Sequence, residues 1–416
     1  MNRAVVLLTT IILIPFSNSI CLSQSSTNTP YSYYGIGELE VINTSLFSGM
    51  GVAGFGLKSG NYINFNNPAS YSGIDSLSFL FDFVATTAVS NFSSYNETYK
   101  VFNGSIKKLA FGFRIHPRWA MTLGLVPYSS VGYKINFQQT VEGTHDYFDV
   151  VCKGNGGLNK LFFGNSFKLG ERLSVGINSS ILTGSFQKSE TYTYDQFDGY
   201  FQTTSKYKPK SSFVFDFGVQ LSDTIGKNWR YSVGLTGGLN TKIKMYEFLA
   251  HESDTSYNTN DEFQNDISYW IPAYLGAGIT LQSYKWTFVT DFRSQYWAQV
   301  KEKNNDNNLA NSYFFATGVQ YCPNRIMGRT LFKRMSYQLG AHFDQSYVIL
   351  KSTRLNSYGL TMGVVIPLRS QGTNLGVSFD LGNKGVITKG LFKETYFRIN
   401  LSISMGDIWF MKRRFE

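Results

Sequence analysis

The sequence predicts an all-β protein, an antiparallel transmembrane β-barrel of about 14 strands with an N-terminal plug segment. Three observations predict this class: many segments alternate apolar with polar residues, aromatic residues are abundant, and short and long connections take turns along the chain. Of the 416 residues, 16% are aromatic and 16% are charged. The aromatic share is above, and the charged share below, what soluble domains usually have.

The last strand, Glu394 to Gly406, shows the alternation clearly. Apolar side chains take every second position there, and a period of two gives a strand two unlike faces. Trp409 and Phe410 follow, and then a short basic tail. Aromatic residues at the end of an alternating strand are typical of the membrane interface of an outer-membrane barrel. A soluble all-β protein is the alternative, because a sandwich also has alternating strands.

Three parts are expected along the chain, namely a signal peptide at 1–23, a leader and plug at 24–73, and the barrel at 74–416. Arg3 and the apolar stretch from Ala4 to Pro15 form the basic and apolar parts of a signal peptide. Cys21 and Ser23 are small residues at the cleavage positions, so Gln24 is the expected mature start. A lipid-anchored Cys21 is the alternative, although Ile20 before it matches a lipoprotein site poorly. The apolar stretch is too short to span a bilayer as a helix, and no later stretch is long enough. Export without a helical anchor indicates the outer membrane of a Gram-negative bacterium.

Tyr31 to Ser72 is rich in glycine and lacks long alternation, so it is expected to fold inward as the plug. The residues expected to shape the plug are Gly35, Gly37, Asn64, Asn67, Pro68 and Ala69. Gly51, Gly54 and Gly56 have the look of a nucleotide-binding loop. No strand–helix–strand pattern surrounds them, however, which argues against nucleotide binding.

From Asp75 onward, alternation predicts strands with apolar residues facing out and polar or small residues facing in. The expected strands are marked in order by Phe79 and Phe81, Phe111 and Phe113, Trp119 to Gln138, a segment ending at Leu169, Val175 and Ile177, Phe213 and Phe215, Val233 and Leu235, Trp270 to Leu281, Phe288 and Phe292, a segment ending at Cys322, Leu339 and Phe343, Leu360 and Met362, Val377 and Phe379, and Glu394 to Gly406. This even count is what single-chain bacterial barrels have.

The connections between these strands are expected to alternate in length. The short ones are 116–118, 170–172, 223–228, 283–285 and 368–373, with 323–334 as an exception, and the long ones are 91–100, 139–146, 189–208, 250–267, 300–311, 347–355 and 383–393. Short periplasmic turns and longer extracellular loops are typical of outer-membrane barrels. Both ends of the barrel are therefore expected on the periplasmic side.

Charged residues are expected on the inward faces of many strands. They are Asp82, Arg114, Asp216, Asp291, Arg293, Asp344 and Asp380. In a soluble sandwich the charged face meets water, whereas in a barrel it encloses the lumen and the apolar face meets lipid. Mutual pairing of these charges is the main expectation, and contact of any one of them with a ligand is the lesser one.

No cofactor, metal site or catalytic constellation is expected. The histidines lack ligand spacing, and Cys152 and Cys322 lie on well-separated strands, so a disulfide between them is doubtful. His342 and Asp344 share a strand face, but no nucleophile is identifiable beside them. The net charge of +10 comes without a long basic run, which argues against nucleic-acid binding.

The Gly-rich lead, Asn67-Pro68-Ala69 just before the first strand and the strand count resemble the FadL-like family of outer-membrane channels for hydrophobic molecules. The opening Pro30 to Gly37 and the tail Trp409 to Glu416 resemble the Bacteroidetes branch of that family, which includes PorV-like proteins. The resemblance covers essentially the whole mature chain. It implies a plug inside the barrel and a third strand that bends inward to open a gap in the wall.

Pro127 lies in the middle of the third strand, where a proline removes a ladder hydrogen bond and bends the strand. At such a lateral gap, Pro127, Tyr128, Val131 and Tyr133 would border the opening and contact a ligand. A bulge at a strand bend is the alternative interpretation of the proline.

Two functions fit this sequence. The first is passive transport of hydrophobic, fatty-acid-like small molecules through the lateral gap into outer-membrane lipid, which requires an apolar pocket between plug and wall. The second is a non-transporting partner or shuttle barrel of an outer-membrane machine for protein secretion or assembly, which requires a filled lumen and ordered outer loops. Gln187 to Lys210 and His251 to Asp266 are the loops expected to bind such a protein partner.

Overall fold

The computed structural model describes most of the chain. The described residues are 29–41, 45–58, 60–76, 78–95, 97–141, 143, 146–194, 199–210, 212–253, 262–304, 308–323, 330–368 and 372–408. The predicted signal peptide and the Trp409 to Glu416 tail lie outside them. In this described part of the chain, no helix has the length and apolar character needed to cross a membrane.

Nearly all of the regular structure is strand. The strands are β1 (Glu38–Leu39), β2 (Ser78–Ser93), β3 (Thr98–His116), β4 (Trp119–Thr140), β5 (Tyr147–Lys168), β6 (Leu173–Tyr194), β7 (Tyr200–Pro209), β8 (Phe213–Ile225), β9 (Trp229–Gly238), β10 (Thr241–Ser253), β11 (Glu262–Ile271), β12 (Tyr274–Gln282), β13 (Trp286–Gln295), β14 (Ser312–Tyr321), β15 (Ser336–Leu350), β16 (Thr353–Pro367), β17 (Asn374–Gly385) and β18 (Lys393–Ile408). Short helical turns are η2 (Pro30–Tyr33), η3 (Ser45–Phe47), η4 (Pro68–Gly73), η5 (Trp297–Val300), η6 (Glu302–Asn304), η7 (Thr388–Gly390) and α2 (Leu331–Arg334).

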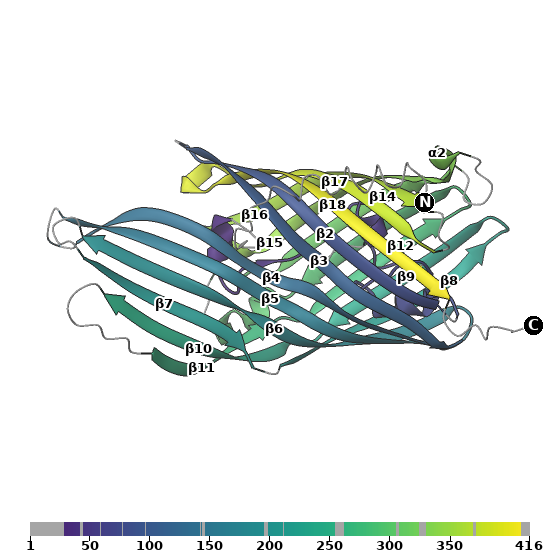
Figure 1. Ribbon diagram of the computed structural model, residues 1–416, viewed down its shortest axis with the longest axis horizontal. Coiled ribbons are helices and arrows are strands. Elements are labelled where there is room, and N and C mark those ends of the chain that lie inside the picture. The colour runs from purple at the N-terminus through teal and green to yellow at the C-terminus, as the bar shows by residue number, and fades with distance from the viewer. Residues whose placement is uncertain are drawn as a thin grey trace, which may run out of the picture.

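The strands from β2 to β18 form one closed antiparallel barrel (Figure 1). The ring closes where β18 pairs with β2, from Lys393 opposite Ser93 to Ile408 opposite Ser78. Three barrel strands consist of two segments each, β7 with β8, β9 with β10, and β11 with β12, because the ladder is interrupted at 210–212, 239–240 and 272–273. The barrel therefore has the 14 strands that the sequence predicted.

The outer face of the wall is apolar and the inner face is small or polar. On β8, Phe213, Phe215 and Phe217 are 39–54% exposed, whereas Val214 and Asp216 between them are buried. The same alternation holds on β13, β15 and β18, as predicted. Exposed phenylalanines in every second position form a belt that water would not favour and lipid would.

Several of the predicted long loops are wrong, because the strands continue through them. The predicted loop 189–208 is the hairpin of β6 and β7, and the predicted loop 347–355 is a tight turn at Lys351 and Ser352, both at positive φ. Strands β4 to β7, β10 and β11 run on beyond the apolar belt at the end away from the barrel's termini, on the left of Figure 1. Polar residues on both faces made these strand ends look like loops, although the ladder holds them as strands.

The described residues between 29 and 76, namely 29–41, 45–58 and 60–76, lie inside the barrel and are called the inner segment here. Its η2 turn packs against β4, and its η4 turn packs against β5, β6 and β8. Buried side chains of the inner segment, including Tyr31, Ile36, Met50, Ile63 and Tyr71, form apolar clusters with the wall. These clusters fill much of the lumen with protein.

Glycines on the inner face of the wall let the inner segment approach the strands closely. This glycine ring comprises Gly112, Gly164, Gly176, Gly218, Gly234, Gly278, Gly318 and Gly340, on strands from β3 round to β15. A Cβ at any of them would lie 1.9–3.0 Å from an atom of the inner segment. All lie in the strand halves nearer the short turns, so the inner segment is fitted tightly to that end of the barrel.

Candidate functional site

Neighbouring strands β3 and β4 are hydrogen-bonded over only part of their length. Their pairing runs from His116 opposite Trp119 to Leu109 opposite Leu125 and stops there. Beyond that point β4 continues to pair with β5, with a bulge at Tyr128 between Pro127 and Ser129. The wall between β3 residues 98–108 and β4 residues 126–140 therefore lacks a ladder.

The inner segment occupies this interruption. Its short strand β1 pairs with β4, Glu38 opposite Ser130 and Leu39 opposite Ser129, and the Glu40 N–H donates to the Tyr128 carbonyl at 3.0 Å. Five successive β4 residues, 129–133, are buried, whereas a strand between lipid and lumen buries every second one. This part of β4 is covered by protein on both faces.

Two ion pairs tie the inner segment to the wall here, and together with Ser130 they are called the latch. The Lys107 ammonium of β3 lies 2.6 Å from the Glu40 carboxylate, and the Ser130 hydroxyl of β4 donates to the same carboxylate at 2.9 Å. Glu38 pairs with Lys384 of β17. Glu40 thus joins the two strands whose own ladder is missing.

The electrostatics of the latch favour the charged form of Glu40. Burial alone would raise the pKa of this carboxyl group. The Lys107 ammonium and the Ser130 hydroxyl outweigh burial, so the pKa of Glu40 lies below its ordinary value. Glu40 is therefore ionised at neutral pH and can pair with the Lys107 ammonium.

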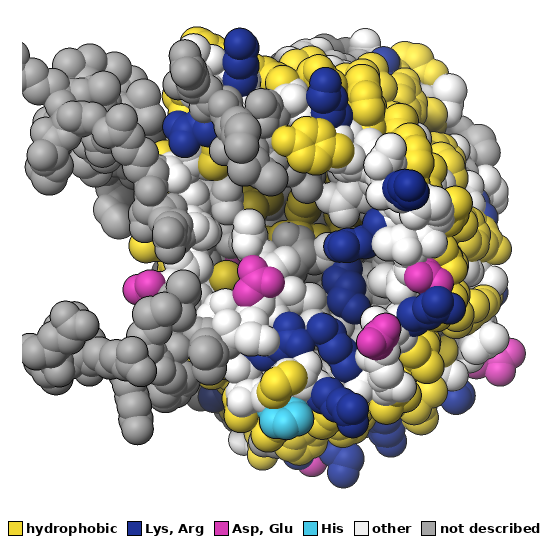
Figure 2. Space-filling model, turned by 90° about the vertical axis from the view of Figure 1, so that its right-hand side faces the viewer, with side chains coloured by type: hydrophobic (Ala, Val, Ile, Leu, Met, Phe, Trp, Pro, Cys, Tyr) yellow, Lys and Arg dark blue, Asp and Glu magenta, His cyan; other side chains and the backbone are white. Residues whose placement is uncertain are grey.

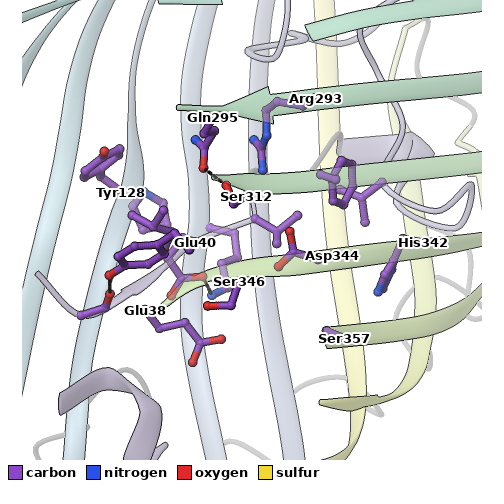
Figure 3. A pocket seen from close by; sticks show the side chains of 18 of the residues that line it. Glu38, Glu40, Tyr128, Arg293, Gln295, Ser312, His342, Asp344, Ser346 and Ser357 are labelled. Carbon is purple, nitrogen blue, oxygen red and sulfur yellow. Dashed lines mark hydrogen bonds and ion pairs between the residues drawn. The ribbon is translucent and has the colours of Figure 1, made fainter. Parts of the chain in front are cut away.

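A cavity of about 240 Å³ lies behind the latch, between the inner segment and the wall. Figure 3 shows Glu38 and Glu40 on one side of it and Arg293, His342 and Asp344 on the strands opposite. The charged or titratable residues around it are Glu38, Glu40, Lys107, Lys160, Asp216, Arg293, His342, Asp344, Asp380, Lys384, Glu394 and Arg398. Leu39, Phe55, Tyr128, Val214 and Phe314 are among its apolar residues. The lining is thus mixed, not the continuous apolar pocket that hydrophobic transport leads one to expect.

Several predicted inward charges pair with basic residues of other wall strands, and not with one another as the sequence led us to expect. Asp82 lies 2.9 Å from Lys108, Asp216 lies 3.1 Å from Lys160, and Asp380 lies 3.5 Å from Arg398. Asp291 instead accepts the backbone N–H of Phe55 at 2.7 Å and that of Gly54. The lumen charges thus hold strands to one another and the inner segment to the wall.

The four residues predicted to border a gap do not share one environment. Pro127 and Tyr128 line the cavity, and the Lys160 ammonium lies 5.2 Å from the centre of the Tyr128 ring. Val131 and Tyr133 are buried in the apolar cluster, where Tyr133 meets Tyr33 edge to face at 5.3 Å. Only the first two can contact a molecule in the cavity.

The six predicted plug residues lie within the inner segment. Gly35 and Gly37 have positive φ, and the Tyr347 hydroxyl donates to the Gly37 carbonyl at 2.7 Å. The Asn64 amide donates to the Gly54 carbonyl at 2.6 Å. The Asn67 side chain accepts the Ala69 N–H at 3.0 Å and so caps η4, whose first residue is Pro68.

Sequence reasoning missed the latch and the glycine ring. Glu40 and Lys107 are far apart in the chain, so no local pattern joins them. The glycine ring had a visible signal, because most of its members occupy the inward phase of alternating strands, where a side chain is expected.

In the described part of the chain, no group of three or more metal-ligating side chains comes together, and Cys152 and Cys322 are both free. His342 Nε2 lies 3.2 Å from the Tyr396 hydroxyl and 3.8 Å from Asp380. These contacts hold His342 within the charged lining of the cavity.

Solved structures share this fold. The chain is similar to the CymD monoaromatic hydrocarbon channel, with a TM-score of 0.57 and 14% identity over 89% of this chain and 99% of that one. It is similar to a Pseudomonas aeruginosa FadL homologue, with a TM-score of 0.58 and 12% identity over 88% of this chain and 98% of that one. It is also similar to the Pseudomonas putida toluene transporter TodX, with a TM-score of 0.56 and 13% identity over 90% of this chain and 100% of that one.

At this low identity the likeness establishes the fold, which agrees with the predicted FadL-like resemblance. Together with the apolar outer belt, the fold identifies an outer-membrane β-barrel. No curated protein matches the chain. One family model, that of BamG, matches residues 1–416, and the chain belongs to the BamG family.

Proposed function

We propose that this protein is a closed partner barrel of the outer membrane, a subunit that holds other proteins rather than a channel that conducts cargo along its axis. The observation that carries the proposal is the latch. Part of the interruption between β3 and β4 is occupied by the chain's own residues 38–40, which are hydrogen-bonded to β4 and joined by partly buried ion pairs to β3 and β17.

Two further features support a filled barrel. The glycine ring leaves no room for cargo between the inner segment and the wall at the short-turn end. The cavity behind the latch carries many charged groups, and an apolar molecule gains little by displacing the water that solvates them. A lumen of this kind supports the wall better than it supports transport.

Isolation from native membranes tests the partner role. The barrel is extracted in mild detergent, and the proteins and lipids that remain with it are quantified by mass spectrometry. A protein partner at constant stoichiometry, with no bound lipophile, is the expected result. The same preparation in liposomes should take up a fluorescent fatty acid no faster than empty liposomes. Rapid uptake by a barrel without a protein partner would overturn the proposal.

A second candidate function is lateral passage of a hydrophobic small molecule between β3 and β4. The missing ladder beyond Leu125 favours it, and so do the named hydrocarbon and toluene channels that share the fold. In this case the inner segment would act as a gate, and Pro127 and Tyr128 would border the path.

Substitution at the bulge separates the two candidates. The variant Pro127→Ala, Tyr128→Ala should lose a bound lipophile, or its uptake, if molecules pass there. Pro367→Ala, at the other end of the wall on β16, is the matched control and should change nothing. Unchanged partner stoichiometry, together with no lipophile in any of the three proteins, would rule out lateral passage.

A further inference from the structure

Positive charge gathers at the end of the barrel that carries the short turns. Figure 2 shows this end, where Lys and Arg side chains are more frequent than Asp and Glu around the middle of the face. Lys58 of the inner segment lies at this end, where it donates to Ser174 at the start of β6. Arg114 near the end of β3, Lys168 at the end of β5 and Arg230 near the start of β9 lie at the same end, and all three repel its charge. The seam between inner segment and wall therefore brings together four cations from four elements.

These cations have few negative partners. Within the described ranges, Lys58, Lys168 and Arg230 form no ion pair, and Lys58 donates only to the Ser174 hydroxyl of β6 at 3.3 Å. Arg114 donates to the Ile74 carbonyl at 2.6 Å and to that of Pro117, which are both uncharged.

The nearby carboxylates do not balance this cluster. Asp75 attracts Arg114 and Lys168. Asp223 is already paired with Arg172 at 3.0 Å. Partial burial, and then repulsion by Lys168, Arg114 and Arg230, lower the pKa of Lys58 to about 8. An anion placed at the seam would remove this repulsion.

The cluster is too wide for a single small anion. From β3 to β9 the wall crosses five strand spacings, roughly 24 Å along its curve at about 4.8 Å each. In an extended peptide, alternate side chains on one face recur about every 7 Å. Several carboxylates on one chain can therefore reach these cations together, whereas one phosphate reaches only part of them.

We propose that the seam around Lys58, Arg114, Lys168 and Arg230 docks an acidic segment of a periplasmic polypeptide. This inference rests on the proposed partner role and names the chemistry of one partner. The site faces water at the short-turn end, away from the apolar belt, which favours a soluble segment over a lipid headgroup.

A labelled peptide of alternating Glu and Ser tests the site. Binding to the full-length barrel in detergent is measured by fluorescence anisotropy. Replacing three cations in Lys58→Gln, Lys168→Gln, Arg230→Gln should weaken binding about tenfold or more. The matched control is Lys100→Gln, Lys134→Gln, Lys153→Gln, which changes the net charge equally at exposed positions in the strand halves of the opposite end and should leave affinity nearly unchanged.

The pH dependence provides a second readout. Because the pKa of Lys58 is about 8, its charge and the affinity should fall between about pH 7 and about pH 9. Lys58→Arg should bind the peptide and lose this pH dependence, because arginine stays charged.

Four outcomes would overturn the acidic-segment proposal. They are equal weakening in the control variant, no binding at all, competition by inorganic phosphate at the peptide's own concentration, and stronger binding to vesicles of anionic phospholipid than to the peptide. A stoichiometric partner that stays bound to the Lys58→Gln, Lys168→Gln, Arg230→Gln barrel would overturn this site alone and leave the partner function standing. Loss of the partner role with peptide binding intact would do the reverse.

Discussion

At the scale of single residues, Asp82 and Lys108 hold the inner segment to the wall. Both side chains are fully buried, and their charged atoms are 2.9 Å apart. Lys108 also donates to the Ile63 carbonyl at 2.9 Å, and Asp82 accepts the Ile63 N–H at 3.0 Å. This ion pair between neighbouring wall strands thus hydrogen-bonds both the N–H and the carbonyl of Ile63 in the inner segment.

Removing the cation of this pair should destabilise the barrel strongly. Lys108→Met leaves the Asp82 carboxylate buried without its counter-charge, and breaking such a pair costs about 3–5 kcal/mol. Urea unfolding, followed by the gel shift of the folded barrel, measures the loss. Lys206→Met, at an exposed position of β7, is the control and should stay within about 0.5 kcal/mol of the natural sequence. Equal effects of the two changes would show that the buried pair has no special weight.

The lowered pKa of Glu40 predicts how the inner segment responds to low pH. A carboxyl group whose pKa is lowered by folding contributes stability above its unfolded pKa of about 4.3, and that stability is lost as the pH falls through the folded value. Hydrogen exchange of residues 37–41, corrected for intrinsic rates, should therefore stay slow from neutral pH down to below about pH 4.3.

Glu40→Gln tests the cause of that protection. Without the carboxylate, Lys107 and Ser130 lose the group that joins them, so exchange of residues 37–41 should be faster at all pH values. Glu252→Gln, near the end of β10 and far from Glu40, is the control, and residues 37–41 should exchange in it as slowly as in the natural sequence. Slow exchange in Glu40→Gln would mean that β1 pairing and the Glu38–Lys384 ion pair hold the segment without Glu40.

At the scale of elements, the inner segment packs closely against the wall strands because glycines there carry no side chain. A Cβ at Gly340 of β15 would lie 2.2 Å from the Gly51 nitrogen of the inner segment. A Cβ at Gly199, by contrast, would have no neighbouring atom within 4 Å. The two glycines therefore differ in whether a methyl group has room.

Gly340→Ala should push the inner segment from the wall at a cost of about 1–3 kcal/mol, the usual range for overpacking. Limited proteolysis of residues 45–74 and urea unfolding measure the displacement and the cost. Gly199→Ala, in open space, should behave as the natural sequence does. Unchanged resistance of the inner segment to proteolysis in Gly340→Ala would indicate that the neighbouring backbone moves to make room at little cost in free energy.

The sequence predicted the strands better than their ends. Alternation identified β8 through Phe213 and Phe215, because lipid on one face and protein on the other impose opposite polarities. This contrast is weak along β7, because polar residues such as Gln202, Thr203 and Thr204 occupy both of its faces. This segment was therefore read as a loop, although the hydrogen-bond ladder continues through it.

At the scale of the whole molecule, the sequence predicted what repeats and missed what is unique. The 14-strand closed ring follows from a pattern that every strand shares. The latch joins Glu40 to Lys107 and Glu38 to Lys384, and such pairs are fixed only once the ring brings distant strands together. Pro127 pointed to part of the candidate site, because the bulge beside it depends on local sequence. The charged lining of the cavity comes from strands spread along the chain, so no local pattern predicts it.

The whole molecule also has two unlike ends. At the end with the barrel's termini the inner segment packs closely against the wall and the basic seam is found, while the opposite end extends into paired strands beyond the apolar belt (Figure 1). An inner segment packed against the wall at one end and strands extended at the other are in keeping with the partner role proposed above.

The glycine ring also bears on the order in which the molecule is made. Close contact between the inner segment and strands from β3 to β15 favours assembly of the wall around that segment over its later insertion. The inner segment is synthesised before any wall strand, and β18, which closes the ring, is synthesised last. We expect the sheet to curl around a segment that is already in place, so that folding of this barrel ends with wrapping rather than filling.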